Sequence, residues 1–185
     1  NSKQNFAEVS LELGGKSPFI VFDDANIDSA VNASIAGIFG ATGQSCVAGS
    51  RLYLHEDIAE ECLAKMIHAV GEIRIGDPLD DETQMGPLCT TGQLENIAAE
   101  VAHAQGEGAT VLAGGKQPHG MGGLFYEATI IDCPRQDLRI VDTELFGPVL
   151  CVQRFTTEKE VIGLANDSEH GLAAGIFTRD SARSL

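Results

Sequence analysis

The chain has 185 residues, the length of one ordinary domain, and its 43% hydrophobic content is enough for a buried core. Twelve Lys and Arg against 27 Asp and Glu give a formal net charge of −15, which argues against nucleic acid or an anionic membrane as a partner. No apolar run is long enough to span a membrane, and residues 1–10 lack the apolar core of a signal peptide. We expect a soluble, acidic, globular protein.

Short β-like runs alternate with helical stretches along the chain. In order, the pattern predicts a strand at 17–22, a helix from Asn26 to about Gly40, a strand at 51–55, and helices at 58–70 and 93–105. It then predicts strands at 110–112, 128–131 and 149–155, a helix at 158–166, a strand at 173–178, and the opening of a helix at 179–185. Strands separated by helices indicate one α/β domain, with an open, twisted, mostly parallel sheet flanked by helices.

The five cysteines, Cys46, Cys62, Cys89, Cys133 and Cys151, are odd in number and widely scattered. Without a C-x-x-C pair they suggest neither a zinc site nor a disulfide scaffold. We therefore expect a reducing compartment, the cytoplasm, and mostly buried thiols.

Cys46 differs from the other cysteines in its neighbours, because small residues and glycines flank it from Gly40 to Gly49. Such a backbone can approach a ligand closely, and its N–H groups can face a developing oxyanion. The local composition fits a nucleophilic thiol, and it also fits a packed thiol in a glycine-rich turn.

Glu12 stands between Leu11 and Leu13 and is followed by Gly14 and Gly15. A carboxyl group in apolar surroundings has a raised pKa, which suits a general base. The alternative is a carboxylate at a strand end that points to water or pairs with Lys16.

Three ordered motifs are more specific than either residue alone. LELGGKSP (residues 11–18), GQSCVAGSR (43–51) and ELFGPV (144–149) resemble the signature segments of the NAD(P)-dependent aldehyde dehydrogenase superfamily. The segments at 76–88 and 166–180 also resemble that family, so the similarity covers nearly the whole chain. It implies the α/β fold of an aldehyde dehydrogenase catalytic domain.

The resemblance implies a role for each motif. Cys46 would attack an aldehyde, and the thiohemiacetal would give a hydride to NAD or NADP and leave a thioacyl enzyme. Glu12 would activate the water that hydrolyses the thioester, and the Cys46 backbone N–H would be one oxyanion donor. Glu144 would accept hydrogen bonds from the nicotinamide ribose, and Phe146 would pack near the nicotinamide.

Structural roles stay open for the cofactor-binding pair: Glu144 as the partner of a nearby cation, Phe146 as a core aromatic. Gln93 matches a cofactor-contacting position of the family only loosely. Lys16, Arg51 and the five histidines are interpreted as structural or solvated, and no metal site is expected.

The resemblance further implies that residues 1–185 are a catalytic-domain segment, with an N-terminal cofactor-binding domain and a C-terminal end outside them. We expect these 185 residues alone to be inactive and the complete enzyme to be a homo-oligomer. One alternative is a CoA-acylating semialdehyde dehydrogenase, but that branch lacks the carboxylate present here as Glu12. The other is a non-catalytic relative with a binding or structural role.

Overall fold

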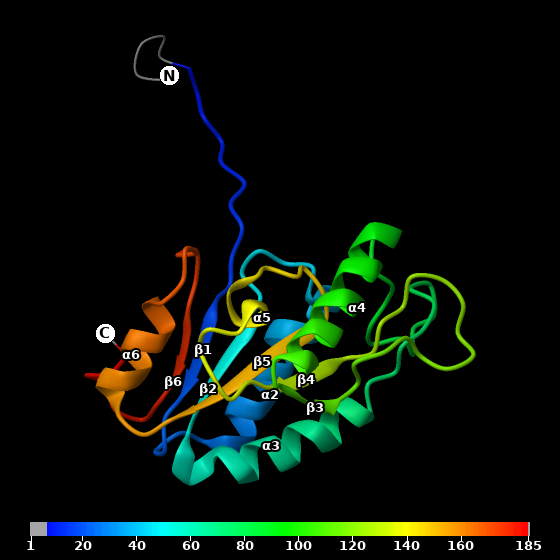
Figure 1. The fold of residues 1–185 in the computed structure, drawn as a ribbon. Helices are drawn as coiled ribbons and strands as arrows, with labels where there is room; N and C mark the ends of the chain where they lie inside the picture. The colour runs from blue at the N-terminus through cyan, green and yellow to red at the C-terminus, as the bar shows by residue number, and fades with distance from the viewer. Residues whose placement is uncertain (1–6, 185) are drawn as a thin grey trace.

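The computed structural model describes residues 7–184, and in them six strands form one sheet in the order β3-β4-β5-β2-β1-β6 (Figure 1). The strands are β1 (Pro18–Val21), β2 (Arg51–His55), β3 (Thr110–Ala113), β4 (Thr129–Asp132), β5 (Val149–Phe155) and β6 (Gly175–Phe177). Every neighbouring pair is parallel except β3 and β4, which are antiparallel. The predicted mostly parallel α/β sheet is confirmed.

Helices cover both faces of the sheet (Figure 1). They are α2 (Ile27–Phe39), α3 (Glu56–Gly71), α4 (Thr91–Gly106), α5 (Arg139–Asp142) and α6 (Glu158–Asn166), with a 3₁₀ turn η1 (Gly40–Gly43) after α2. The side chains of α2 and α3 share one apolar cluster with the sheet, those of α4 and α5 share a second, and α6 closes a third.

Strand β2 shows why both faces must be covered. Leu52 and Leu54 point into the α2 and α3 cluster, whereas Tyr53 points into the cluster closed by α6. All three are fully buried, as expected for a central strand of a parallel sheet. Burial of each leucine contributes about 1.5–3 kcal/mol.

Capping side chains fix where the helices begin. Asn26 caps α2 as predicted, since its Oδ1 accepts a hydrogen bond from the Ser29 N–H at 2.9 Å. Helix α3 begins at Glu56, two residues earlier than expected, because the His55 side chain accepts from the Asp57 N–H. Helix α4 likewise begins two residues early, where Thr90 caps it.

Two predictions at the end of the chain are corrected. The last strand is shorter than expected, and the described part of the expected helix at 179–185 forms turns through Ser184. There Arg183 packs over the Phe22 ring, 4.6 Å from its centroid, and its Nε donates to Glu158 Oε2 at 3.1 Å. These contacts fold the segment back onto the body instead of continuing a helix.

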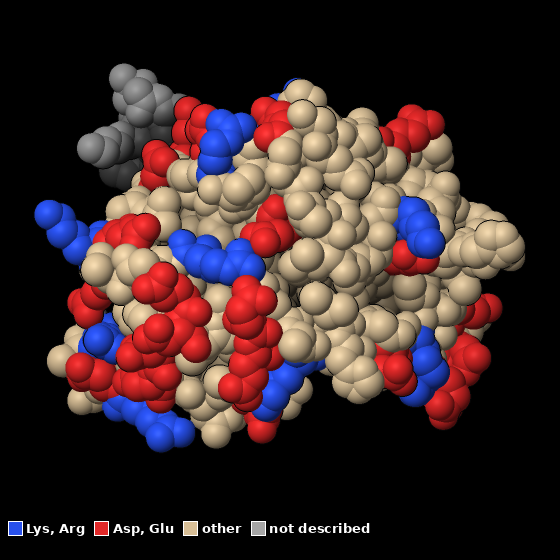
Figure 2. Space-filling view, turned by 60° about the horizontal axis from the view of Figure 1, so that its bottom comes forward, with Lys and Arg blue, Asp and Glu red and all other residues tan. Residues whose placement is uncertain are grey.

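Surface charge follows the composition. Figure 2 shows acidic side chains gathered on one side of the viewed face, with Lys and Arg scattered among them. A polyanion approaching this acidic region would meet like charge. None of the helices in residues 7–184 has the length and hydropathy that crossing a membrane requires.

Candidate active site

The three motif segments each lead directly into a central strand. Residues 11–17 precede β1, residues 43–50 precede β2, and residues 144–148 precede β5. Because β5, β2 and β1 are parallel neighbours, their amino ends lie side by side, along the upper edge of the sheet in Figure 1. The topology therefore gathers motifs that are up to 129 residues apart.

Gly14 and Gly15 form the contact between the three segments. The Gly15 N–H donates to Glu144 Oε1 at 3.0 Å. A Cβ on Gly14 would lie 2.4 Å from Glu144 Oε2, and a Cβ on Gly15 would lie 2.1 Å from the Cys46 carbonyl oxygen. Both distances are shorter than real Cβ contacts. At Gly15 the clash is with backbone, so this packing requires a glycine there, whereas at Gly14 the clash is with the end of the flexible Glu144 side chain. Gly14 and Gly15 thus admit the protein's own carboxylate and backbone.

A left-handed turn precedes the cysteine loop. Ala41, Thr42 and Gly43 have φ values of 51°, 58° and 68°, a conformation that costs a residue with a side chain about 1–2 kcal/mol. A Cβ on Gly43 would lie 2.1 Å from the Gly147 carbonyl oxygen. The turn thus packs closely against the segment that carries Glu144 and leads into the loop of the half-buried Cys46.

Two polar side chains of this turn bind the neighbouring loop. Thr42 Oγ1 donates to the Gly86 carbonyl at 3.1 Å. Gln44 Nε2 donates to the Pro87 carbonyl at 3.2 Å, and its Oε1 accepts from the Cys89 N–H at 2.9 Å. Neither residue stands out in the sequence, because their partners lie more than 40 residues away.

Phe146 and Glu144 do not take the two structural roles that the sequence left open, a core aromatic and the partner of a cation, in the described residues. Phe146 has a φ of 54°, is 43% exposed, and its carbonyl accepts a hydrogen bond from Gln93 Nε2. Its exposure argues against a core aromatic. Among residues 7–184 no ion pair involves Glu144, so the expected alternative, a cation partner, is not found there.

Glu12 lies apart from this cluster. Its segment runs outward from the body in an extended conformation (Figure 1), with Val9, Leu11 and Leu13 all more than half exposed. The Glu12 side chain is exposed as well. The expected apolar enclosure of Glu12 is therefore wrong for the described residues. Lys16 also does not pair with it, because its Nζ is buried and donates to the Thr143 carbonyl at 2.7 Å.

A small pocket opens where the segments meet. Its wall includes Gly15, Lys16, Ser45, Glu144 and Phe146. The pocket is therefore lined by residues of all three motif segments. Its lining residue Ser45 directly precedes Cys46 in the chain.

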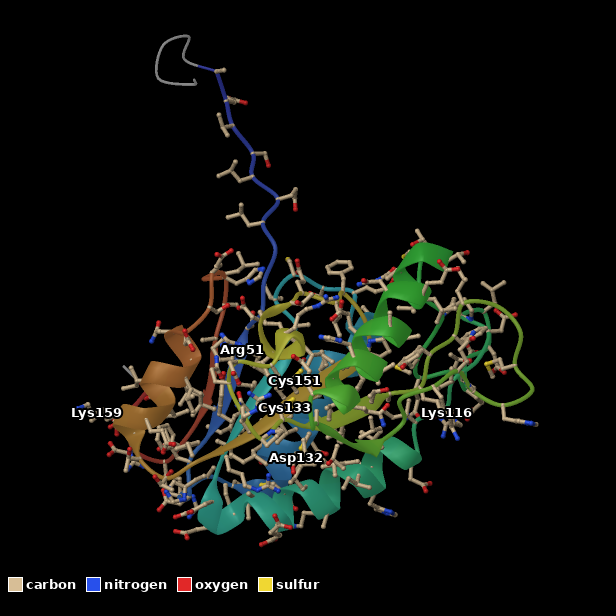
Figure 3. All side chains as sticks on the ribbon, viewed as in Figure 1. Arg51, Lys116, Asp132, Cys133, Cys151 and Lys159 are labelled. Carbon is tan, nitrogen blue, oxygen red and sulfur yellow. The ribbon has the colours of Figure 1, made fainter. Side chains whose placement is uncertain are left out.

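The remaining thiols behave as predicted. Cys62, Cys133 and Cys151 are buried and free, and burial raises the pKa of Cys62 to about 11. Figure 3 shows Cys133 and Cys151 in the interior of the molecule, in contrast to Lys116 and Lys159 at its periphery. Within residues 7–184 no group of His, Cys, Asp and Glu side chains could hold a metal ion.

Arg51 is structural, as interpreted from the sequence, and Figure 3 shows it in the interior. Its Nε donates to the Lys16 carbonyl at 2.7 Å, and its Nη2 donates to the Ala165 carbonyl at 2.8 Å near the end of α6. Arg51 Nη1 donates to the Leu164 carbonyl at 3.2 Å. A cation suits the carboxyl end of a helix, where carbonyl groups lack partners.

Comparisons with known proteins give one consistent result. A profile of the "Aldehyde dehydrogenase family" matches residues 1–185. A (Z)-2-((N-methylformamido)methylene)-5-hydroxybutyrolactone dehydrogenase of Acinetobacter baylyi is 51% identical over 185 residues, 100% of this chain and 38% of that protein. A betaine aldehyde dehydrogenase of Brucella anthropi is 45% identical over 183 residues, 97% of this chain and 38% of that protein.

The fold agrees with the sequence comparison. The structure of a betaine aldehyde dehydrogenase from Staphylococcus aureus in complex with NAD⁺ superposes with a TM-score of 0.92 and 40% identity, covering 99% of this chain and 37% of that one. The chain thus spans less than two fifths of the length of these relatives. On its profile match, its fold and its ordered motifs, the chain belongs to the aldehyde dehydrogenase family.

Proposed function

We propose that this chain is the catalytic segment of an enzyme that oxidises an aldehyde to a carboxylic acid with NAD or NADP. The observation that carries the proposal is the contact at Gly14 and Gly15. There the Cys46 backbone and the Glu144 carboxylate meet at a double glycine, and the Cys46 carbonyl leaves no room for a Cβ on Gly15.

In the proposed reaction, the Cys46 thiolate attacks the aldehyde carbon. A carbon–sulfur bond forms, the carbonyl π electrons move to oxygen, and the backbone N–H of Cys46 stabilises the oxyanion. The strained turn before Cys46 and the fixed carbonyl of Cys46 at Gly15 hold the loop in one position. Such a fixed position lowers the barrier because the thiol needs little reorganisation to reach the carbonyl.

The nicotinamide, when bound, would accept the hydride and its electron pair from the thiohemiacetal carbon. Glu144 and Phe146 fit this end of the cofactor. The Glu144 carboxylate is already oriented by the Gly15 N–H, lines the pocket and has no ion-pair partner among the described residues, so it suits a ribose diol. Phe146 exposes apolar surface beside it.

Glu12 is proposed to act in the second half of the reaction. Its carboxylate takes a proton from water, the resulting hydroxide attacks the thioacyl carbon, and the carbon–sulfur bond breaks to return the Cys46 thiolate. Only Leu13 separates Glu12 from Gly14, which packs against Glu144, so one end of the Glu12 segment is anchored at the site.

We also propose that the complete enzyme has further domains outside these residues, works in the cytoplasm and forms a homo-oligomer. All five cysteines are free thiols, as a reducing compartment would keep them. The outer edge of β6 carries exposed Ile176, with exposed Leu172 and Ile162 nearby, and a subunit contact would cover such an edge.

The test compares two cysteine variants of the complete enzyme with an aldehyde and either cofactor. Cys46→Ser should lower turnover by several orders of magnitude, because a hydroxyl is a much poorer nucleophile than a thiolate. The control is Cys89→Ser, since Cys89 is exposed and only its backbone N–H contacts Gln44. Turnover of Cys46→Ser close to that of Cys89→Ser would remove the thiol from the mechanism.

A further inference from the structure

Lys16 is a buried cation for which the proposed reaction has no use. Only 2% of its surface is exposed, although a lysine side chain normally reaches water. Burial lowers the pKa of Lys16 and is the largest influence on it; Cys151, Cys133 and Asp142 act to raise this pKa, and Arg51 acts to lower it.

The side chain of Lys16 ends on the segment that carries Glu144. Its Nζ donates to the Thr143 carbonyl at 2.7 Å, one residue before Glu144. The residue before Lys16 contacts Glu144 itself, because the Gly15 N–H donates to Glu144 Oε1. Lys16 and Glu144 also line the same pocket.

The base of Lys16 is itself fixed. Arg51 Nε donates to the Lys16 carbonyl at 2.7 Å, and the Arg51 N–H donates to the Ser17 carbonyl at 3.2 Å. Arg51 thus secures the backbone of Lys16 to β2. The ammonium group then transmits that position to Thr143.

We propose that Lys16 is a positioning residue for cofactor binding, whose bond to the Thr143 carbonyl sets where the Glu144 carboxylate meets the nicotinamide ribose. The inference rests on the proposed function of Glu144. Without the bond, the chain before Glu144 is free to shift, and the carboxylate loses its alignment with the Gly15 N–H. The cofactor half that carries nicotinamide is affected, and the adenosine half is not.

The experiment measures binding of NADH and of ADP to the complete enzyme by calorimetry. ADP lacks the nicotinamide ribose, so it reports the rest of the cofactor site. Lys16→Met should weaken NADH binding about tenfold or more, the effect of losing alignment with a charged hydrogen-bonding group, and leave ADP binding within twofold. Lys16→Arg, which keeps a long cationic donor, should recover part of the NADH affinity. In kinetics, the KM for the cofactor should rise more than kcat falls.

Two controls separate the possible failures. Met66→Ala removes a buried side chain of α3 outside the site and reports the effect of lost stability alone. Glu144→Ala tests the proposed function. If Glu144→Ala weakens NADH binding and Lys16→Met does not, the role of Lys16 is refuted alone. If neither does, the role of Glu144 is refuted with it.

The double variant Lys16→Met, Glu144→Ala supplies an independent measurement. If Lys16 acts through Glu144, the double variant binds NADH no more weakly than Glu144→Ala. Additive losses overturn the proposal. Should Lys16→Met not fold, Lys16→Gln takes its place, since it keeps a polar group in the buried position with a side chain one bond shorter.

Discussion

Replacing Gly15 with alanine should disable Cys46, the proposed nucleophile, without unfolding the protein. The new Cβ would lie 2.1 Å from the Cys46 carbonyl oxygen, and real Cβ contacts begin near 3.0 Å. One of two backbone segments must therefore move by about 1 Å. A shift of that size in a reacting group costs roughly a hundredfold in rate, so Gly15→Ala should lower kcat of the complete enzyme about a hundredfold.

The neighbouring glycine supplies a contrasting variant. A Cβ on Gly14 meets the end of the flexible Glu144 side chain, which can turn aside. Gly14→Ala should therefore spare kcat and weaken cofactor binding, since the displaced carboxylate loses a hydrogen bond worth about 1.5–3 kcal/mol, or roughly 10- to 150-fold in affinity. Gly37→Ala is the matched control, because Gly37 lies in α2 with open space around it and alanine favours a helix.

Steady-state kinetics and thermal unfolding of the three variants test whether the close approach of Gly15 holds the Cys46 loop in place. We expect Gly37→Ala to be as active as the parent and slightly more stable. A Gly15→Ala enzyme with kcat within threefold of the parent would show that the close approach of Gly15 to Cys46 does not hold the nucleophile, and the reasoning would fail.

Three further predictions concern the charged and nucleophilic groups. Glu12→Gln should give a burst of reduced cofactor followed by a slow phase, because hydride transfer precedes the step that needs a base; an intact protein without a burst would assign Glu12 an earlier role. Iodoacetamide at pH 7.5 should alkylate Cys46 faster than exposed Cys89 and leave Cys62 unmodified, since burial raises the pKa of Cys62 to about 11. Peptide mass spectrometry measures the order of modification, and equal rates at Cys46 and Cys62 would contradict a reactive thiol at Cys46. Hydrogen bonds from the backbone N–H and hydroxyl of Thr156 lower the pKa of Glu160, so its stabilising effect is present above the unfolded-state value of 4.5 and is lost as pH falls through the lower folded value. The melting temperature of Glu160→Gln should thus lie below that of the parent at pH 6, and the gap should narrow as the pH falls below 4.5; an unchanged gap would refute the assignment.

The sequence correctly predicted the strands and helices whose bounds are set by their own apolar pattern and flanking residues. The strands at 51–55 and 149–155 and the helix at 158–166 have the bounds that their apolar runs and flanking polar residues indicate. Helix α5 was missed because its four residues, Arg139–Asp142, are too few to show a helical period. The left-handed run at Ala41 and Thr42 was missed for a different reason, since contacts with Gly86 and Gly147 hold it and both are distant in sequence.

Some features of the candidate site could likewise be predicted from the sequence, and others could not. Sequence motifs indicated Cys46, Glu144 and Phe146, and the parallel order of the strands explains why their segments meet. The environment of Glu12 was not predicted, because flanking leucines in sequence need not be buried. Lys16 was interpreted as structural or solvated, and only the bond across 127 residues to Thr143 reveals its connection to Glu144.

The strand order also determines when this site can exist during synthesis. The centre of the sheet pairs β2 with β5, so the thiol loop before β2 emerges from the ribosome nearly a hundred residues before the strand that must lie beside it. The contacts of Gly15 with Glu144 and of Gly43 with Gly147 wait for the same late segment. Such non-local pairing is slow to form. Cys46, the proposed nucleophile, therefore lacks its final environment in the nascent chain until the segment before β5 has been synthesised.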